Sequence, residues 1–144
     1  MAFSDLTDPV FEAIRTHLTS AWTETPIGWP NEAHSFEKAS DPWVLVEYAG
    51  TVYGQQSLGA GEQQEENRWD ADGILWMHLF VPVGSGSRNA QGGAKRLAEL
   101  FRGALLLDDA LEFLDAEIGL GEPGADDGKW WRVSVAIGWR HTNA

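Results

Sequence analysis

The 144-residue sequence contains no cysteine and few basic residues. Without cysteine, the chain can form neither a disulfide framework nor a cysteine-ligated metal site. Ten Lys and Arg against 22 Asp and Glu give a net charge of −12, which has the wrong sign for a protein that holds duplex DNA by neutralising its phosphates. An acidic wall can still let nucleic acid pass without adhesion, because like charges repel.

Long apolar runs are missing as well. No stretch approaches the roughly 18 apolar residues that a membrane span needs, and residues 1–5 lack the basic and then apolar pattern of a signal peptide. The length suits one domain with one core. We therefore expect a single domain over residues 1–144 that has no membrane partner. We expect it to stay in the cytoplasm or in a particle assembled there.

Tryptophan, in contrast, is abundant, with eight in the chain. Tryptophan is costly to expose and is enriched at protein interfaces. We expect at least half of these side chains to fill the core and the others to serve contacts with further protein.

The stretch from Trp43 to Val83 organises the chain. Residues 43–49 and 74–81 alternate like strands with two largely apolar faces, and a glycine-spaced acidic segment, residues 50–73, separates them. We predict a central hairpin whose long connection is an arm that contacts a neighbour. The residues proposed for this arm are Gln55, Gln56, Leu58, Glu62, Glu65, Glu66, Arg68, Trp69 and Asp70. Strands that are apolar on both faces need cover on both faces, and a second subunit could supply one cover.

Other elements follow from periodicity and from turn residues. Helices are predicted from Asp8 to residues 22–24 and from residues 88–89 to 106, each with one apolar stripe. Residues 25–31 read as extended and 31–42 as a loop. Residues 108–124 read as partly strand-like, and 129–140 as a strand with one apolar face. The prediction is an α+β fold, in which a mixed, mostly antiparallel sheet of four to five strands carries two helices packed on one face.

The second predicted helix gathers basic residues. Arg88, Lys95, Arg96 and Arg102 are four of the ten in the chain. Such a face on an acidic protein favours complementary charge between neighbours. A solvated face with local pairing to Glu99 is the equal alternative. Together with two residues of the last strand, these four are the candidates for subunit contact; the two are Trp130 and Arg132.

No pattern of catalytic or ligand-binding residues is present. The four histidines lack metal-ligand spacing, Ser57 is not in a G-x-S-x-G turn, and no phosphate-binding loop occurs. His78 lies in an apolar strand and is predicted to be a satisfied core or interface histidine. The sequence therefore indicates an interaction protein without enzymatic activity, metal or cofactor.

Several pieces together resemble the tail terminator family of long-tailed bacteriophages, of the phage lambda type. The T-P-x-x-W-P-N run at residues 25–31 follows a helix that ends in Trp22. A Trp-led strand at 43 then precedes G-Q-Q-S-L-G at 54–59, and V-P-V-G-S-G at 81–86 precedes the second helix. The chain closes with G-K-W-W-R-V-S-V at 128–135. Through this resemblance, residues 50–58 continue or turn with the first strand, which narrows the free arm to 59–73.

The resemblance implies an assembly as well as a fold. A homohexameric ring would cap the head-proximal end of the tail tube, stop tube polymerisation and join the head connector or neck protein, while DNA passes through the lumen. Gene-transfer-agent particles use the same kind of protein. The departures are the acidic arm and the acidic region at 108–127, which leave open which ring face meets the tube.

Alternatives from other classes stay open at this point. A neck, tail-completion or tail tube protein of similar fold would differ from a terminator by polymerising or by its place on the particle. A small-ligand-binding domain would be a monomer with a Trp-lined pocket. A monomeric domain with a docking helix is the third alternative.

Overall fold

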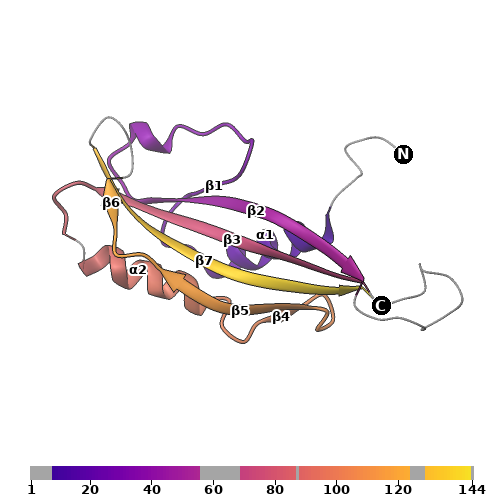
Figure 1. Ribbon diagram of the computed structural model, residues 1–144. Coiled ribbons are helices and arrows are strands. Elements are labelled where there is room, and N and C mark those ends of the chain that lie inside the picture. Colours follow the sequence, from indigo (N-terminus) through magenta and orange to yellow (C-terminus); the bar gives the residue numbers. More distant parts are fainter. Residues whose placement is uncertain (1–7, 56–68, 87, 124–128, 144) are drawn as a thin grey trace, which may run out of the picture.

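The computed structural model describes residues 8–55, 69–86, 88–123 and 129–143. Two helices and seven strands lie in these ranges (Figure 1). The helices are α1 (Pro9–Ala21) and α2 (Arg88–Glu99), and a short 3-10 turn, η2, spans Phe36–Lys38. The strands are β1 (Ile27–Gly28), β2 (Trp43–Gln55), β3 (Trp69–Pro82), β4 (Leu105–Leu106), β5 (Leu111–Ile118), β6 (Glu122–Pro123) and β7 (Trp130–Asn143).

One mixed sheet contains all seven strands in the order β1-β2-β3-β7-β5-β4, with β6 paired to β7. Only the β1–β2 pair is parallel. The α+β class and the two helices are confirmed, but the expected four to five strands were too few. The additional strands β1, β4 and β6 have two residues each. β1 lies within residues 25–31, which were predicted to be extended, whereas β4 and β6 are too short to show a period of two in the sequence.

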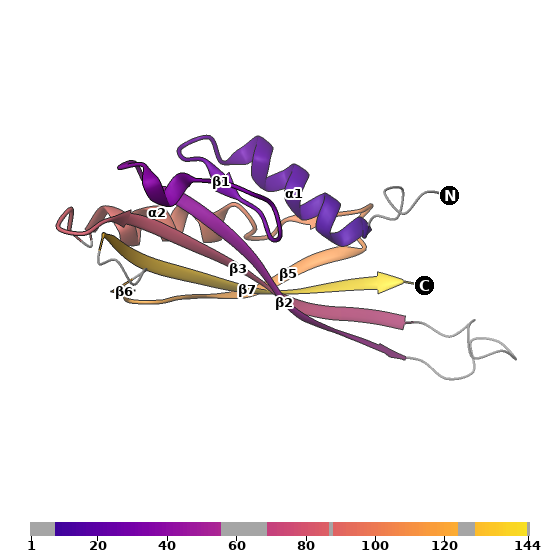
Figure 2. The same ribbon diagram turned by 90° about the horizontal axis from the view of Figure 1, so that it is seen from above.

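The three central strands are longer than predicted. β3 pairs with β7 without interruption, from Trp69 opposite Asn143 to Pro82 opposite Trp130. β2 pairs with β3 as far as Gln55, with an irregularity between Ala49 and Val52. The sheet curls, and the far ends of β2 and β3 turn away from α1 (Figure 2). Residues 50–55 continue β2, one of the two courses that the resemblance implies for residues 50–58, whereas residues 69–73, expected in the arm, belong to the sheet. The rest of the expected arm, residues 56–68, lies outside the described residues.

Helix α1 begins and ends as its sequence predicted. The Asp8 carboxylate accepts a hydrogen bond of 2.8 Å from the Val10 N–H, and proline occupies the first turn. The buried stripe consists of Val10, Ile14 and Leu18. At the other end, the Trp22 N–H donates to the Leu18 carbonyl as the chain turns extended.

Helix α2 ends seven residues earlier than the predicted Leu106. After Glu99 the backbone tightens, because Phe101 N–H and Arg102 N–H donate three residues back, to the carbonyls of Ala98 and Glu99. Gly103 then takes a φ of +68°, the left-handed conformation that ends many helices. Phe101 stays buried, as its place on the apolar stripe predicted. Leu105, however, lies in β4 and is 56% exposed.

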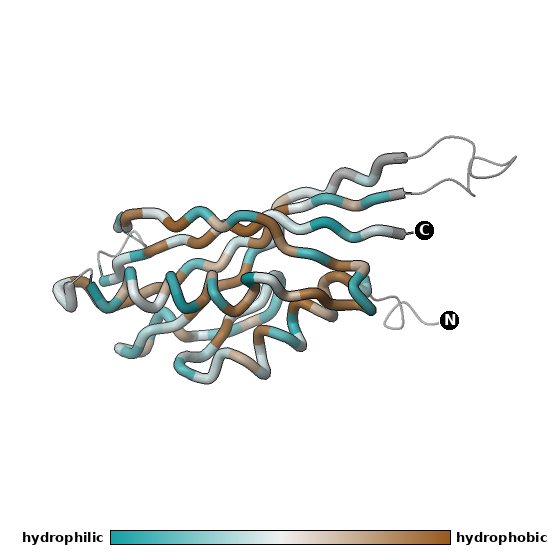
Figure 3. Tube along the Cα trace, turned by 90° about the horizontal axis from the view of Figure 1, so that it is seen from below, coloured by the Kyte–Doolittle hydropathy of each residue, from teal (hydrophilic) through white to brown (hydrophobic). Residues whose placement is uncertain are grey.

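The main core lies between the two helices and the inner face of the sheet. It joins Ile14 and Leu18 of α1, Leu97 of α2, and the inward side chains of β2, β3 and β7. Apolar residues, brown in Figure 3, occur on both the helices and the strands that enclose this core. The predicted inner face of β7 is confirmed, because Val133, Val135, Ile137 and Trp139 are all buried.

The outer face of the sheet is covered at one end. There, Trp43, Phe80 and Trp130 form a second buried cluster, against which Phe36 and Leu45 pack. Elsewhere on this face, Ile74 is 41% exposed and Leu114 is 49% exposed. The predicted cover for the second apolar face is thus supplied in part by the chain's own loop.

A glycine beside a tryptophan makes the packing of β3 on β7 testable. A Cβ on Gly73 would lie 2.4 Å from Cζ2 of Trp139, which is 2% exposed. We expect Gly73→Ala to lower the free energy of unfolding by about 1–3 kcal/mol, because the indole must shift in a packed core. Chemical denaturation at fixed protein concentration measures this. Gly50→Ala is the control, since a Cβ there meets no atom within 4 Å. Equal stability of the two variants would contradict the packing.

Tyr48 provides a test in alkaline solution. Its ring stacks on Phe11 with centroids 4.2 Å apart, and burial raises the pKa of Tyr48 from 10.0 to about 12. Because the tyrosine ionises at lower pH in the unfolded chain, the stability that buried, neutral Tyr48 contributes is fully present below pH 10. This contribution is lost as the pH rises toward 12. The chain has two tyrosines, so ultraviolet titration of Tyr53→Phe reports Tyr48 alone. If Tyr48 ionises near pH 10 while the circular dichroism spectrum is still that of the folded protein, the ring is not buried.

Candidate interaction surfaces

The predicted basic residues all lie on the surface. Arg88, Lys95 and Arg96 project from α2, and Arg102 lies in the turn after it. We call these four residues the basic surface. Among the described residues, Arg96 is the member of this surface that makes an ion pair: its Nη1 lies 2.7 Å from Glu24 Oε1, and its guanidinium is 6.0 Å from the Trp22 ring. The alternative of local pairing through Glu99 therefore does not describe Arg96, which pairs with the segment after α1.

The other three cations of the basic surface are differently placed. Arg88, Lys95 and Arg102 make no ion pair within the part of the chain that the structure describes. On a protein of net charge −12, many carboxylates are available to form an ion pair with a cation. Three unpaired cations on one surface therefore favour attraction of a further acidic molecule over internal stabilisation.

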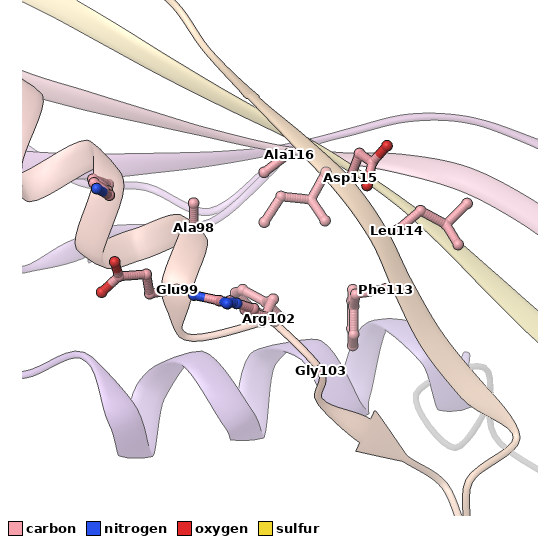
Figure 4. Close-up of a pocket in the computed structure, with 11 residues that line it drawn as sticks. Ala98, Glu99, Arg102, Gly103, Phe113, Leu114, Asp115 and Ala116 are labelled. Atoms are coloured by element: carbon pink, nitrogen blue, oxygen red, sulfur yellow. The ribbon is translucent and has the colours of Figure 1, made fainter.

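A groove separates α2 from strand β5, with a volume of about 810 Å³. Lys95, Glu99 and Arg102 line it on the helix side (Figure 4). Phe113, Leu114 and Asp115 line it on the strand side, where the pairing of β5 with β7 is irregular between Phe113 and Ala116. Within the described residues, β4 pairs with β5 only at Leu111 and Glu112. The groove thus combines a charged rim with a strand edge, a surface suited to an extended acidic segment.

The two candidates from the last strand differ from one another. Trp130 is 2% exposed, and its indole N–H donates to the Glu37 carbonyl at 3.2 Å. Its ring meets Trp43 edge-on, so the side chain fills the second cluster of its own chain. Arg132 is part-exposed and pairs with Glu122 of β6. Both residues are therefore engaged within the chain, whereas Arg88, Lys95 and Arg102 have no ion-pair partner among the described residues.

The arm candidates divide at the edge of the described residues. Gln55 ends β2 opposite Trp69, which begins β3, and Asp70 is 3% exposed. Gln56, Leu58, Glu62, Glu65, Glu66 and Arg68 lie outside the described residues.

One polar network was not foreseen from the sequence. His78 is 8% exposed, with Nδ1 2.7 Å from Ser134 Oγ and Nε2 2.9 Å from Glu47 Oε1. His78 is thus a satisfied histidine, as its place in an apolar strand predicted. In the sequence, His78 lies 31 positions after Glu47 and 56 positions before Ser134. Only the strand register, which sets His78 opposite Leu45 and Ser134, brings the three residues together. Side chains on neighbouring strands could not be matched without that register.

The Glu47–His78–Ser134 network has the residue types of a hydrolase triad, but not its surroundings. A triad needs donors that stabilise an oxyanion beside the serine. Ser134 lies in the middle of a paired strand, where backbone N–H groups serve the ladder. Glu47, His78 and Ser134 line a pocket to which Arg132 contributes the cationic donor, and Arg132 is already paired with Glu122. The arrangement therefore orders the outer face of the sheet.

Neither a metal site nor a membrane-crossing helix occurs among the described residues. No three His, Asp or Glu side chains there come close enough to hold an ion. No helix in this part of the chain has the length and apolar character that would let it cross a bilayer.

Comparison with known proteins gives a family and a fold. The family model of the phage tail terminator protein matches residues 9–139. A solved structure that shares 19% sequence identity covers 94% of each chain with a TM-score of 0.60, which supports the fold alone. No curated protein sequence matches the chain. The family match spans both helices and nearly the whole sheet, and it confirms the resemblance seen in the sequence. This chain therefore belongs to the phage tail terminator protein family and is a structural component of the virion tail.

Proposed function

We propose that the protein forms a homohexameric ring that caps the head-proximal end of the tail tube. The ring stops further addition of tube protein and offers a surface to the head connector or neck protein. The observation that carries the proposal is the family match over residues 9–139. The same role would serve a phage or a gene-transfer-agent particle.

Charge on the protomer supports contact between copies. Three cations of the basic surface are unpaired within the part of the chain that the structure describes, while the chain as a whole carries 22 acidic residues. A neighbouring copy can therefore meet the basic surface with an acidic one, and complementary potentials fix the orientation of such a contact. A contact between two different surfaces is head-to-tail, and it generates a ring when its rotation closes.

The proposed action is steric and electrostatic, without a chemical reaction. Tail-tube assembly stops because the exposed face of the ring does not template another tube ring. The net charge of −12 repels phosphates, so DNA crosses the lumen without specific binding. As one domain over residues 1–144, each copy supplies the whole set of surfaces.

Charge reversal on α2 tests the ring. We expect Lys95→Glu to raise the concentration needed for half assembly about tenfold or more, equivalent to about 1.4 kcal/mol per contact. Because Lys95 is exposed and unpaired in the described structure, the free energy of unfolding should change by less than about 0.5 kcal/mol. Lys95→Arg, which keeps the positive charge at the same exposed position, is the matched control.

Light scattering and sedimentation across a concentration series measure both variants against the wild type. If the wild type stays monomeric at high concentration, even with tube protein present, the proposed ring is contradicted. If the chain alone polymerises into long tubes, it is a tube protein and not a terminator.

The absence of catalysis is tested at Ser134. We expect Ser134→Ala to reduce the free energy of unfolding by about 1–2 kcal/mol, because a buried ring nitrogen of His78 loses its partner. The slow hydrolysis of p-nitrophenyl acetate should be the same for wild type and variant. A rate that depends on Ser134 would show that the network acts as a nucleophile, and the proposed steric role would then be incomplete.

A further inference from the structure

A second recess lies on the outer face, where β2 begins, β3 ends and β7 begins. Its volume is about 410 Å³. Trp43, Phe80 and Trp130 supply its aromatic walls, and Glu32, His34 and Glu37 of the preceding loop complete the rim. We call this recess the aromatic pocket.

The walls of the aromatic pocket are held rigidly. Trp43 and Phe80 stack with centroids 4.3 Å apart, and Trp130 stands edge-on to Trp43 at 6.1 Å. The His34 ring lies 5.2 Å from Trp43. The hydrogen bond from the Trp130 indole to the Glu37 carbonyl ties the loop to the sheet. Rigid aromatic faces beside carboxylates form a site that attracts an organic cation.

Three buried polar atoms at the pocket make no hydrogen bond. They are Trp43 Nε1, Glu37 Oε2 and His34 Nδ1, and Trp43 is only 5% exposed. The Glu37 and His34 atoms lie 3.3 Å apart, but they are not aligned as a hydrogen bond. A buried donor or acceptor without a partner is costly, so each such group calls for an explanation. Here the two residues that carry an unused donor and an unused carboxylate oxygen, Trp43 and Glu37, line the same recess.

The other carboxylate at the rim of the aromatic pocket, that of Glu32, already makes an ion pair. Glu32 pairs with Arg15, whose hydrogen bond lowers the pKa of Glu32 and whose guanidinium lies 4.8 Å from the Trp29 ring. This neighbouring pair shows the geometry that the pocket could offer to another cation, an arginine between a carboxylate and an indole. Glu37 and Trp43 present the same two partners without an arginine of their own chain.

We propose that the aromatic pocket binds an arginine or lysine side chain from the basic surface of a second copy of this chain. The cation contacts the aromatic faces and Glu37, while a carbonyl of the same segment accepts the Trp43 N–H. Arg88, Lys95 and Arg102 are the donors that the structure leaves unpaired among the described residues. The source of the cation rests on the proposed ring, since it requires a neighbouring copy.

Binding of a free arginine tests the pocket by itself. Nα-acetyl-arginine amide is titrated into the ¹⁵N-labelled protein, and the indole N–H signal of Trp43 is assigned with Trp43→Phe. We expect a saturable shift of that signal with the arginine probe and none with the neutral isostere Nα-acetyl-citrulline amide. Glu37→Gln should weaken the arginine response at least fivefold while circular dichroism stays unchanged. No shift, or an equal shift with citrulline, would overturn the assignment of a cation site.

A charge exchange tests the source of the cation. Glu37→Arg should raise the concentration for half assembly about tenfold, and one of three second changes should restore it: Arg88→Glu, Lys95→Glu or Arg102→Glu. If the wild type assembles but Glu37→Arg has no effect, the pocket contact is refuted and the ring stands. If the wild type never assembles, the ring fails, whereas the arginine titration still decides the cation site. A positive titration without any restoring exchange would refute the second copy as the source.

Discussion

The uninterrupted pairing of β3 with β7 is the constraint on which the rest of the molecule depends. Fourteen residues of β3 face fourteen of β7, from Trp69 and Asn143 to Pro82 and Trp130. Since successive side chains point to opposite faces, one register assigns every residue of both strands to the inner or the outer side. A slip of one residue would expose Val133, Val135 and Ile137 and bury Arg132 and Ser134 in their place. The core and both outer-face features therefore share one determinant.

The outer face shows how that register creates sites. It aligns His78 with Ser134, and it sets Phe80 beside the position where Trp43 and Trp130 meet. The partners within each group come from different strands and lie at least 37 positions apart in the sequence. Their meeting also explains why the second face of the central strands is apolar at one end and polar in the middle. Aromatic side chains there are held by the loop that carries Glu37, so part of the cover comes from within the chain.

The sequence predicted those elements whose signals are local. The Asp8 cap, the stripe of α1 and the alternation of β7 each lie within a few residues, and each was found in the structure. The early end of α2 was missed, because Leu105 fits a helical stripe and only the turn at Gly103 redirects it. The extension of β2 over residues 50–55 was expected from the family resemblance and not from periodicity, because glycines interrupt this stretch. The early start of β3 was missed, because residues 70–73 are polar or small. Their order comes from long-range pairing.

The candidate site divides in the same way. Exposure of Lys95 and Arg102 followed from their position off the apolar stripe. Burial of Trp130, however, depends on Trp43 and Glu37, which lie more than 80 residues away. Likewise, the ion pair of Arg96 with Glu24 links α2 to the segment after α1. The spacing of residues within one helix cannot predict such a pair. Partners that are distant in sequence were therefore the part that sequence patterns could not supply.

The distribution of charge connects this protomer to the proposed assembly. Arg15, Arg96, Arg132 and Arg140 each pair with a carboxylate of the same chain. With so many acidic groups available, cations left unpaired are conspicuous, and the described ones on α2 lie together on one surface. A single chain that carries both a basic surface with three cations unpaired among the described residues and an excess of acid favours contact between unlike surfaces of successive copies. In a closed ring every such surface meets a partner, whereas an open filament leaves one of each at its ends. Closure therefore fixes the number of copies in the proposed ring, while tube growth stops at the ring face that does not template another tube ring.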